Sequence, residues 1–109
     1  MRLNNNITQV QTVTTSVNLA AIDLATIDTF SMQLVLSANS SSDASFKLQV
    51  SNDGINYVDV AGSTIAAVAN GTHMLHIARL DNLHVRGVFT ASTGTIVGTL
   101  IWVFRQSNP

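Results

Sequence analysis

The sequence predicts an all-β protein, namely an antiparallel β-sandwich or jelly-roll-like fold of about eight short strands. Three observations predict it. Apolar and polar residues alternate with a period of two in several short segments. Turn residues such as Asn-Gly and Asp-Gly separate these segments, at the spacing typical of such folds. The chain has 109 residues, 46% of them hydrophobic, which suffices for the core of a single domain spanning residues 1–109.

The N-terminal segment is rich in β-branched residues, which favour a strand over a helix. Its alternation is weak, because Val10, Val13 and Val17 fall out of phase. We therefore expect residues 1–17 to form an N-terminal arm or an edge strand, which can add to a neighbouring subunit. Residues 18–28 lack the capping box and charge pairs of a helix, and this predicts a turn-rich connection.

The central third of the chain carries the clearest strand patterns. Residues 29–37 predict a strand with these apolar residues on one face: Phe30, Met32, Leu34 and Leu36. A polar loop at residues 39–43 precedes a β-hairpin over residues 46–60, whose turn-forming motif is Asn52-Asp53-Gly54. Gly54 tolerates a positive φ, and the Asp53 side chain is expected to accept bonds from nearby backbone N–H groups.

Four further strands are predicted after this hairpin. Residues 64–69 form a weak strand, and Asn70-Gly71 predicts a two-residue hairpin that joins it to a strand over residues 72–78. A turn at Asp81-Asn82 leads into a strand over residues 83–89. Residues 95–105 then form the last strand.

The last strand has apolar residues on both faces. One face carries Ile96, Leu100, Trp102 and Phe104, and the other carries Val97, Ile101 and Val103. This pattern indicates either a central strand covered on both sides or a strand with one face buried against another chain. We favour the second, because a two-sheet sandwich leaves its outer faces in water. The candidate assembly residues are Val97, Ile101, Val103, Val10 and Val13.

The composition favours a chain that works in an assembly. Charged residues make up 10% of the sequence, against about 25% in typical soluble domains. A free monomer usually keeps a more charged surface, so we expect a homo-oligomer. Glu is absent, the formal charge is −1 and the five cations are scattered, which argues against nucleic acid as a partner. Neither a signal peptide nor an apolar run long enough for a membrane helix is visible.

No residue pattern indicates an enzyme, a cofactor or a metal site. Zinc would need a third ligand beside the histidines, for which Asp81 is the one nearby carboxylate. The three histidines are His73, His76 and His84. Asp53, Asn56 and Asp59 superficially resemble a calcium loop, but a chain without Glu cannot supply the closing ligand of an EF-hand. The six Asp residues are dispersed and no Gly-x-Ser-x-Gly elbow occurs, so we expect no catalysis.

The hairpin carries a family resemblance. A strand followed by Ser51-Asn52-Asp53-Gly54, two residues and an aromatic resembles a segment of small phage virion proteins of the head-decoration, head-fibre, neck or tail accessory type. The segments 83–86 and 91–95 are similar to their C-terminal part. Tyr57 stands where tryptophan is usual in these proteins, and His84 stands where an aromatic is usual.

The resemblance implies a non-enzymatic structural subunit of a bacteriophage particle. Such a subunit would be made in the host cytoplasm without a signal peptide, would bind other virion proteins and would reside in the virion. A similar hairpin also occurs in discoidin-like carbohydrate- or surface-binding modules. That alternative requires an exposed Tyr57, or the loops 39–43, 61–63 and 79–82 gathered at one end of the sandwich.

Overall fold

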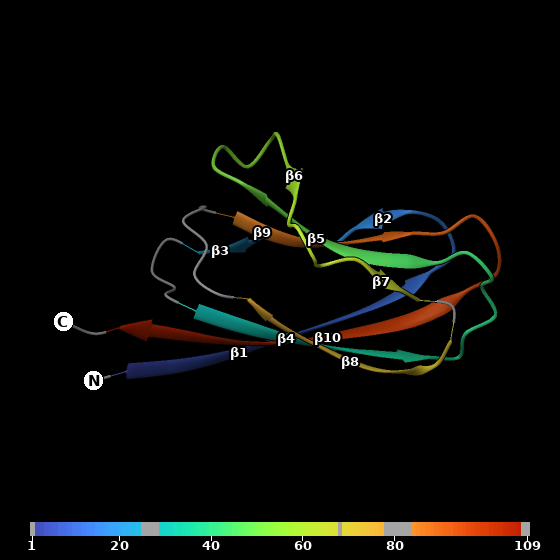
Figure 1. Cartoon of the computed structure of the whole chain (residues 1–109), viewed down its shortest axis with the longest axis horizontal. Coiled ribbons are helices and arrows are strands. Elements are labelled where there is room, and N and C mark those ends of the chain that lie inside the picture. The colour runs from blue at the N-terminus through green and yellow to red at the C-terminus, as the bar shows by residue number, and fades with distance from the viewer. Residues whose placement is uncertain (1, 25–28, 68, 78–83, 108–109) are drawn as a thin grey trace.

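The computed structural model describes residues 2–24, 29–67, 69–77 and 84–107, which form two antiparallel sheets packed face to face (Figure 1). The predicted all-β sandwich is therefore confirmed. One sheet has four strands, in the order β1 (Arg2–Val13), β10 (Ile96–Ser107), β4 (Thr29–Ser37) and β8 (Gly71–Ile77). None of the described residues forms a helix that could cross a membrane.

The second sheet consists of shorter pieces. Its order is β2 (Val17–Asn18), β9 (His84–Thr90), β5 (Ser45–Ser51) and β6 (Val58–Asp59), while β3 (Ile22–Asp23) also pairs with β9 and β7 (Ile65–Ala66) also pairs with β5. When β2 with β3 and β6 with β7 are each taken as one interrupted strand, both sheets contain four strands. This arrangement corresponds to a jelly roll.

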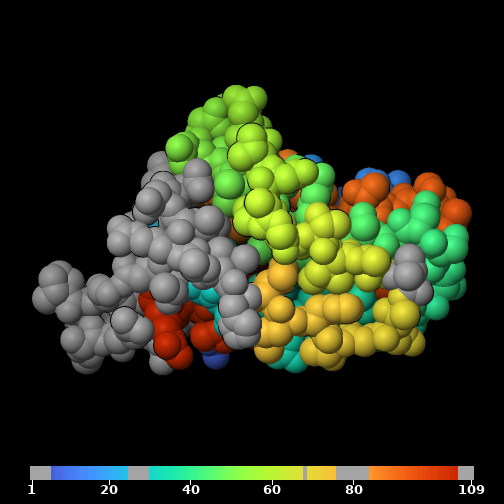
Figure 2. Space-filling model, in the orientation of Figure 1, coloured from blue at the N-terminus to red at the C-terminus, as the bar shows by residue number. Residues whose placement is uncertain are grey.

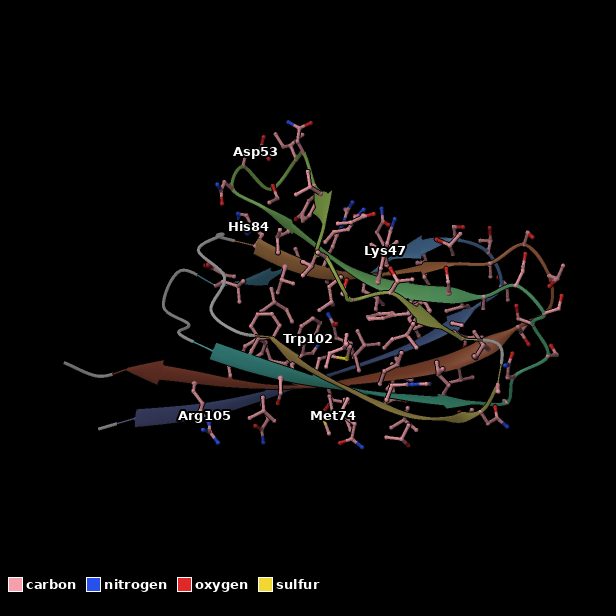
Figure 3. All side chains as sticks on the ribbon, viewed as in Figure 1. Lys47, Asp53, Met74, His84, Trp102 and Arg105 are labelled. Atoms are coloured by element: carbon pink, nitrogen blue, oxygen red, sulfur yellow. The ribbon has the colours of Figure 1, made fainter. Side chains whose placement is uncertain are left out.

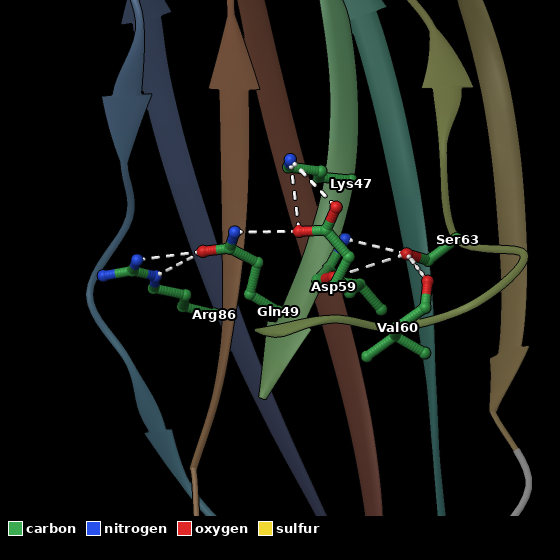
Figure 4. A network of polar contacts seen from close by, with 7 residues as sticks. Lys47, Gln49, Asp59, Val60, Ser63 and Arg86 are labelled. Atoms are coloured by element: carbon green, nitrogen blue, oxygen red, sulfur yellow. Dashed lines mark hydrogen bonds and ion pairs between the residues drawn. The ribbon is translucent and has the colours of Figure 1, made fainter. Parts of the chain in front are cut away.

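The interruption between β6 and β7 has a local cause. The chain turns at Gly62, which has a φ of 76°, and so leaves the edge of β5. The buried hydroxyl of Ser63 then accepts a bond from the Leu48 N–H at 3.0 Å and donates to the Val60 carbonyl at 2.7 Å (Figure 4). A side chain thus satisfies a buried backbone donor that would otherwise lack a strand partner.

Strand β10 determines the two faces of the four-stranded sheet. It pairs with β1 from Arg2↔Ser107 to Val13↔Ile96, and with β4 from Val97↔Ser37 to Arg105↔Thr29. Because partners across antiparallel strands share a face, one phase of β10 faces the second sheet and the other faces away from it. The inward side chains are buried, and they are Ile96, Leu100, Trp102 and Phe104.

In the core, large side chains of one sheet pack directly over glycines of the other sheet. Trp102 lies between the sheets (Figure 3), with its ring centroid 5.8 Å from those of Phe30 and Phe104. Gly98 makes room for the Phe89 ring, since a Cβ there would lie under 3.0 Å from it. Leu100 fills the corresponding space over Gly87 in the other sheet. These gaps let large side chains from each sheet reach the backbone of the other.

One predicted connection is wrong. Asn70-Gly71 does not join two strands into a hairpin, because β7 pairs with β5 in one sheet and β8 pairs with β4 in the other. The chain crosses between the sheets here, and the Asn70 side chain accepts a bond from the Asn39 N–H at 3.1 Å. The predicted turn at Asp81-Asn82 and the end of the 18–28 connection lie outside the described residues.

Candidate assembly interface

The outer face of the four-stranded sheet collects side chains that point away from the second sheet. Figure 3 shows Met74 and Arg105 on this side, opposite to Trp102. The strand registers place the following described side chains on it: Asn6, Thr8, Val10 and Thr12 of β1, Val97, Thr99, Ile101, Val103 and Arg105 of β10, Ser31, Gln33, Val35 and Ser37 of β4, and Thr72 and Met74 of β8. We call this set the outer sheet face.

Apolar side chains occupy the middle of the outer sheet face. The exposed fractions of Val10 and Met74 are 65% and 50%, and the apolar residues of β4 and β10 on this face are half-buried. Val97, Ile101 and Val103 lie along β10, with Thr99 between the first two. Val10 of β1 and Val35 of β4 flank Thr99 on its two sides. The result is an apolar stripe surrounded by Thr, Ser, Asn and Gln.

Charge is almost absent from the outer sheet face. Among its described residues, Arg105 is the one charged side chain. The other charged side chains that the structure describes belong to the six-stranded sheet and to loops. The outer sheet face is therefore nearly uncharged and partly apolar, whereas the opposite side of the sandwich carries most of the described charged side chains.

The charged side carries a connected polar network on β5, β6 and β9 (Figure 4). Arg86 Nε and Nη2 donate to Gln49 Oε1 at 3.1 and 2.9 Å, and Gln49 Nε2 donates to Asp59 Oδ1 at 2.9 Å. Lys47 Nζ lies 3.1 Å from the same carboxylate oxygen. The bond from Gln49, and next that from Lys47, hold the pKa of the Asp59 carboxyl below its usual value.

Tyr57 belongs to this network and is not a free platform. Its ring is half-buried, and the Arg86 guanidinium lies 3.7 Å from the ring centroid. This cation–π contact occupies a ring face that a sugar would need for stacking.

The hairpin turn is built as its sequence predicts. Asp53 Oδ1 accepts bonds from the N–H groups of Asn56 at 2.8 Å and Ile55 at 2.9 Å, and Gly54 has a φ of 73°. These donors, that of Asn56 first, hold the pKa of the Asp53 carboxyl well below its usual range. Residues 52–56 are exposed, and their loop projects from the six-stranded sheet (Figure 2).

The candidate metal ligands are not brought together. His73 lies on β8 and His84 on β9, which belong to different sheets, while the side chain of His76 and all of Asp81 lie outside the described residues. Within the described ranges, no three His or Asp side chains form a group that could hold a metal ion. Asp53 and Asp59 are engaged in the turn and in the polar network, respectively.

The carbohydrate-binding alternative requires three loops gathered at one end of the sandwich, and the two that the structure describes are bonded to different parts of the fold. Asp43 accepts bonds from Ser92 and Thr93, so that the loop 39–43 is fastened to the β9–β10 loop. The segment 61–63 is instead bonded to the middle of β5 through Ser63. The third loop, 79–82, lies outside the described residues.

Four of the five candidate assembly residues lie on the outer sheet face. They are Val97, Ile101, Val103 and Val10. The fifth, Val13, was predicted wrongly as an assembly residue, because it packs in the core with an exposed fraction of 1%. Val10 and Val13 are three residues apart on one strand and so point to opposite faces. Val35 and Met74 were missed, although Val35 interrupts the polar phase of its strand and so gave a signal.

Comparisons with known proteins show that this chain is similar in fold to solved structures. No known family model matches the chain, and neither does any curated protein. One solved structure similar to it is a chain of the Bacillus endospore appendages, described as a novel family of disulfide-linked pili, with a TM-score of 0.69, 10% identity and coverage of 99% of this chain and 89% of that chain. Another is the SPBc2 prophage-derived protein YomS, with a TM-score of 0.62, 15% identity and coverage of 93% and 95%. The chain thus shares its fold with both proteins.

Proposed function

We propose that this chain is a non-enzymatic structural subunit of a bacteriophage particle, which acts by self-association and by binding other virion proteins of the capsid, neck or tail. The observation that carries the proposal is the outer sheet face, where exposed apolar side chains lie in a neutral surround. In this proposal the face is buried in the assembled virion.

The size and composition of the face suit an interface. Four strands spaced about 4.8 Å apart and about 30 Å long present roughly 600 Å², close to the about 800 Å² that each partner contributes to an ordinary interface. Interfaces combine an apolar, charge-depleted centre with a polar rim. The stripe along β10 with its Thr, Ser, Asn and Gln surround has this composition.

The comparisons and the sequence support the same proposal. One protein of similar fold forms pili and another derives from a prophage, which agrees with the hairpin's resemblance to phage virion proteins. This chain contains no cysteine, so it cannot be linked by disulfides. Its contacts with neighbours must therefore rest on surfaces such as the outer sheet face.

The test uses particles made by a phage from which the gene has been deleted. Purified wild-type chain is expected to bind these particles, and an Ile101→Asp variant is expected to lose binding because it places an uncompensated charge in the centre of the interface. The matched control is Ile55→Asp, since Ile55 is 81% exposed in the hairpin loop of the other sheet.

Circular dichroism and unfolding curves must show that both variants fold. Equal binding by Ile101→Asp and wild type would refute the assignment of the outer sheet face. Loss of binding by Ile55→Asp alone would move the interface to the hairpin loop.

A further inference from the structure

The edge of β1 that faces away from β10 is long, and no other described strand pairs with it. Strand β1 has 12 residues and pairs with β10 on one side, and no strand among the described residues pairs with its other side. Twelve residues extend about 40 Å, so the edge runs along most of the 47 Å length of the molecule. The pieces at the margins of the other sheet, β2, β3, β6 and β7, have two residues each.

From Leu3 to Val13, this edge lacks the charged side chains, proline and bulges that usually protect an edge strand against pairing. Natural edge strands are kept apart by charged side chains, proline, bulges or short length. The sequence from Leu3 to Val13 contains neither a charged residue nor proline. The register with β10 runs from residue to residue without a bulge. Its outward N–H and C=O groups therefore present a template for another extended strand.

Strand β1 is also anchored to the rest of the fold through its inward side chains. Gln9 points inward, where its Oε1 accepts a bond from the Trp102 indole at 3.0 Å and its Nε2 donates to the Ala20 carbonyl at 3.1 Å. Ile7 packs against the core on the same face. A partner strand would thus meet a preformed edge and would not have to order it, which lowers the cost of association.

We propose that two copies of this chain pair through their β1 edges, antiparallel about a two-fold axis, and join their four-stranded sheets into one sheet of eight. A strand that pairs with itself must avoid placing like charges opposite each other. The segment from Leu3 to Val13 carries no charged residue and so meets this condition, and its Thr, Asn and Gln side chains can bond across the seam. Strand β8, with seven residues, would leave part of the β1 edge unpaired.

The geometry restricts the register of the pair. Partners in an antiparallel pair share a face, and the two-fold axis is perpendicular to the sheet, so outward residues must meet outward residues. Pairing centred on Thr8 or on Ile7 satisfies this condition. In the first register Thr8 meets its own symmetry mate, and in the second the two Thr8 side chains are diagonal neighbours. Thr8 is exposed on the outer sheet face and lies within reach of its mate in both.

The pair would place both outer sheet faces on the same side, with the exposed Val10 beside the seam. In this respect the inference rests on the proposed function, because the doubled face is the surface offered to the virion. An edge about 40 Å long and 10 Å high buries roughly 400 Å² per copy, half of an ordinary interface. The isolated pair is therefore expected to be weak and dependent on concentration.

The experiment uses charge complementation at Thr8. Thr8→Lys and Thr8→Glu variants of the full chain are prepared separately, and self-association is measured by sedimentation equilibrium. Each variant alone is expected to associate about tenfold or more weakly than wild type, because like charges meet at the seam, and an equimolar mixture is expected to recover the pair. The matched controls are Thr99→Lys and Thr99→Glu, on the same face but one strand further from the seam.

Hydrogen exchange provides the second readout. In the wild type, protection of β1 amides is expected to rise with protein concentration, while that of β8 amides stays constant. A wild type that stays monomeric at every concentration, or a mixture of Thr8 variants without recovery, would overturn the inference. Particle binding lost in Ile101→Asp with the β1 pair intact would separate the two proposals, since the outer sheet face would then act without the edge.

Discussion

Replacing Gly98 by alanine tests how the two sheets fit together. A Cβ at this position would lie under 3.0 Å from Cζ of the Phe89 ring and 3.1 and 3.2 Å from its Cε2 and Cε1, whereas carbon atoms in contact are normally about 3.5–4.0 Å apart. Phe89 is fully buried and its ring packs edge-on against Phe46, with centroids 4.9 Å apart. The ring therefore has no free space to move into. Such overpacking costs about 1–3 kcal/mol, out of the about 5–15 kcal/mol of a typical domain.

The assay is denaturant unfolding followed by circular dichroism, with the free energy of unfolding compared at an unchanged m-value. Gly71→Ala is the matched control, because Gly71 also lies in a strand and a Cβ there meets no atom within 4 Å. The control is expected to be neutral or stabilised by about 0.4–1 kcal/mol, through a less flexible unfolded chain.

Two results would refute this reasoning. Gly98→Ala could unfold at the wild-type denaturant concentration, which would mean that the sheets are not in close contact at this point. The Gly71→Ala control could be destabilised equally, which would make the effect one of strand conformation. A Phe89→Leu background provides an internal check, since Gly98→Ala should cost less there.

Two further predictions concern polar side chains. Gln9→Leu leaves the buried Trp102 N–H without its acceptor and should lower the free energy of unfolding by about 1–3 kcal/mol, whereas Gln11→Leu on the same strand face should change it little; equal losses in thermal melts would contradict this. The pKa of the Asp43 carboxyl lies well below its usual range, first because of the Ser92 hydroxyl bond. Its contribution to stability is therefore present above about pH 4 and lost as the pH falls further. The melting-temperature difference between wild type and Asp43→Asn should shrink below pH 4, and a constant difference would count against the Asp43 contacts.

The sequence predicts those parts of the fold in which one side of a strand is buried. Phe30, Met32, Leu34 and Leu36 recur with a period of two because the second sheet covers one face of β4, so the period is visible without a structure. The hairpin turn could also be predicted, because Asp53 and Gly54 supply local chemistry that depends on few distant contacts.

The sequence of β1 does not reveal which of its residues face the core. Gln9 and Gln11 occupy inward positions, so polar residues stand where apolar ones would reveal the period. Gln9 is tolerated there because Trp102, which is 93 residues away in the sequence, donates to it. No local pattern contains that information, and this explains why Val13 was assigned to the outer face.

The crossing between sheets could not be predicted either. Asn70-Gly71 signals a change of direction, but a turn residue does not determine which sheet the next strand enters. The partner of Asn70 is Asn39, in a distant loop. Met74 could not be predicted as part of the candidate interface for a related reason. It lies in one row with Ile101 and Gln33 only because strands that are distant in the sequence pair with each other.

We propose that this chain is a virion subunit held by its outer sheet face. The most direct measurement is quantitative mass spectrometry of purified particles from the phage or induced prophage that encodes it, with wild-type gene and with the Ile101→Asp substitution. We expect many copies per particle for the wild type and a marked loss for the variant. Reproducible absence of the wild-type chain from particles would contradict the virion assignment, and equal copy numbers for the two chains would contradict the role of the face.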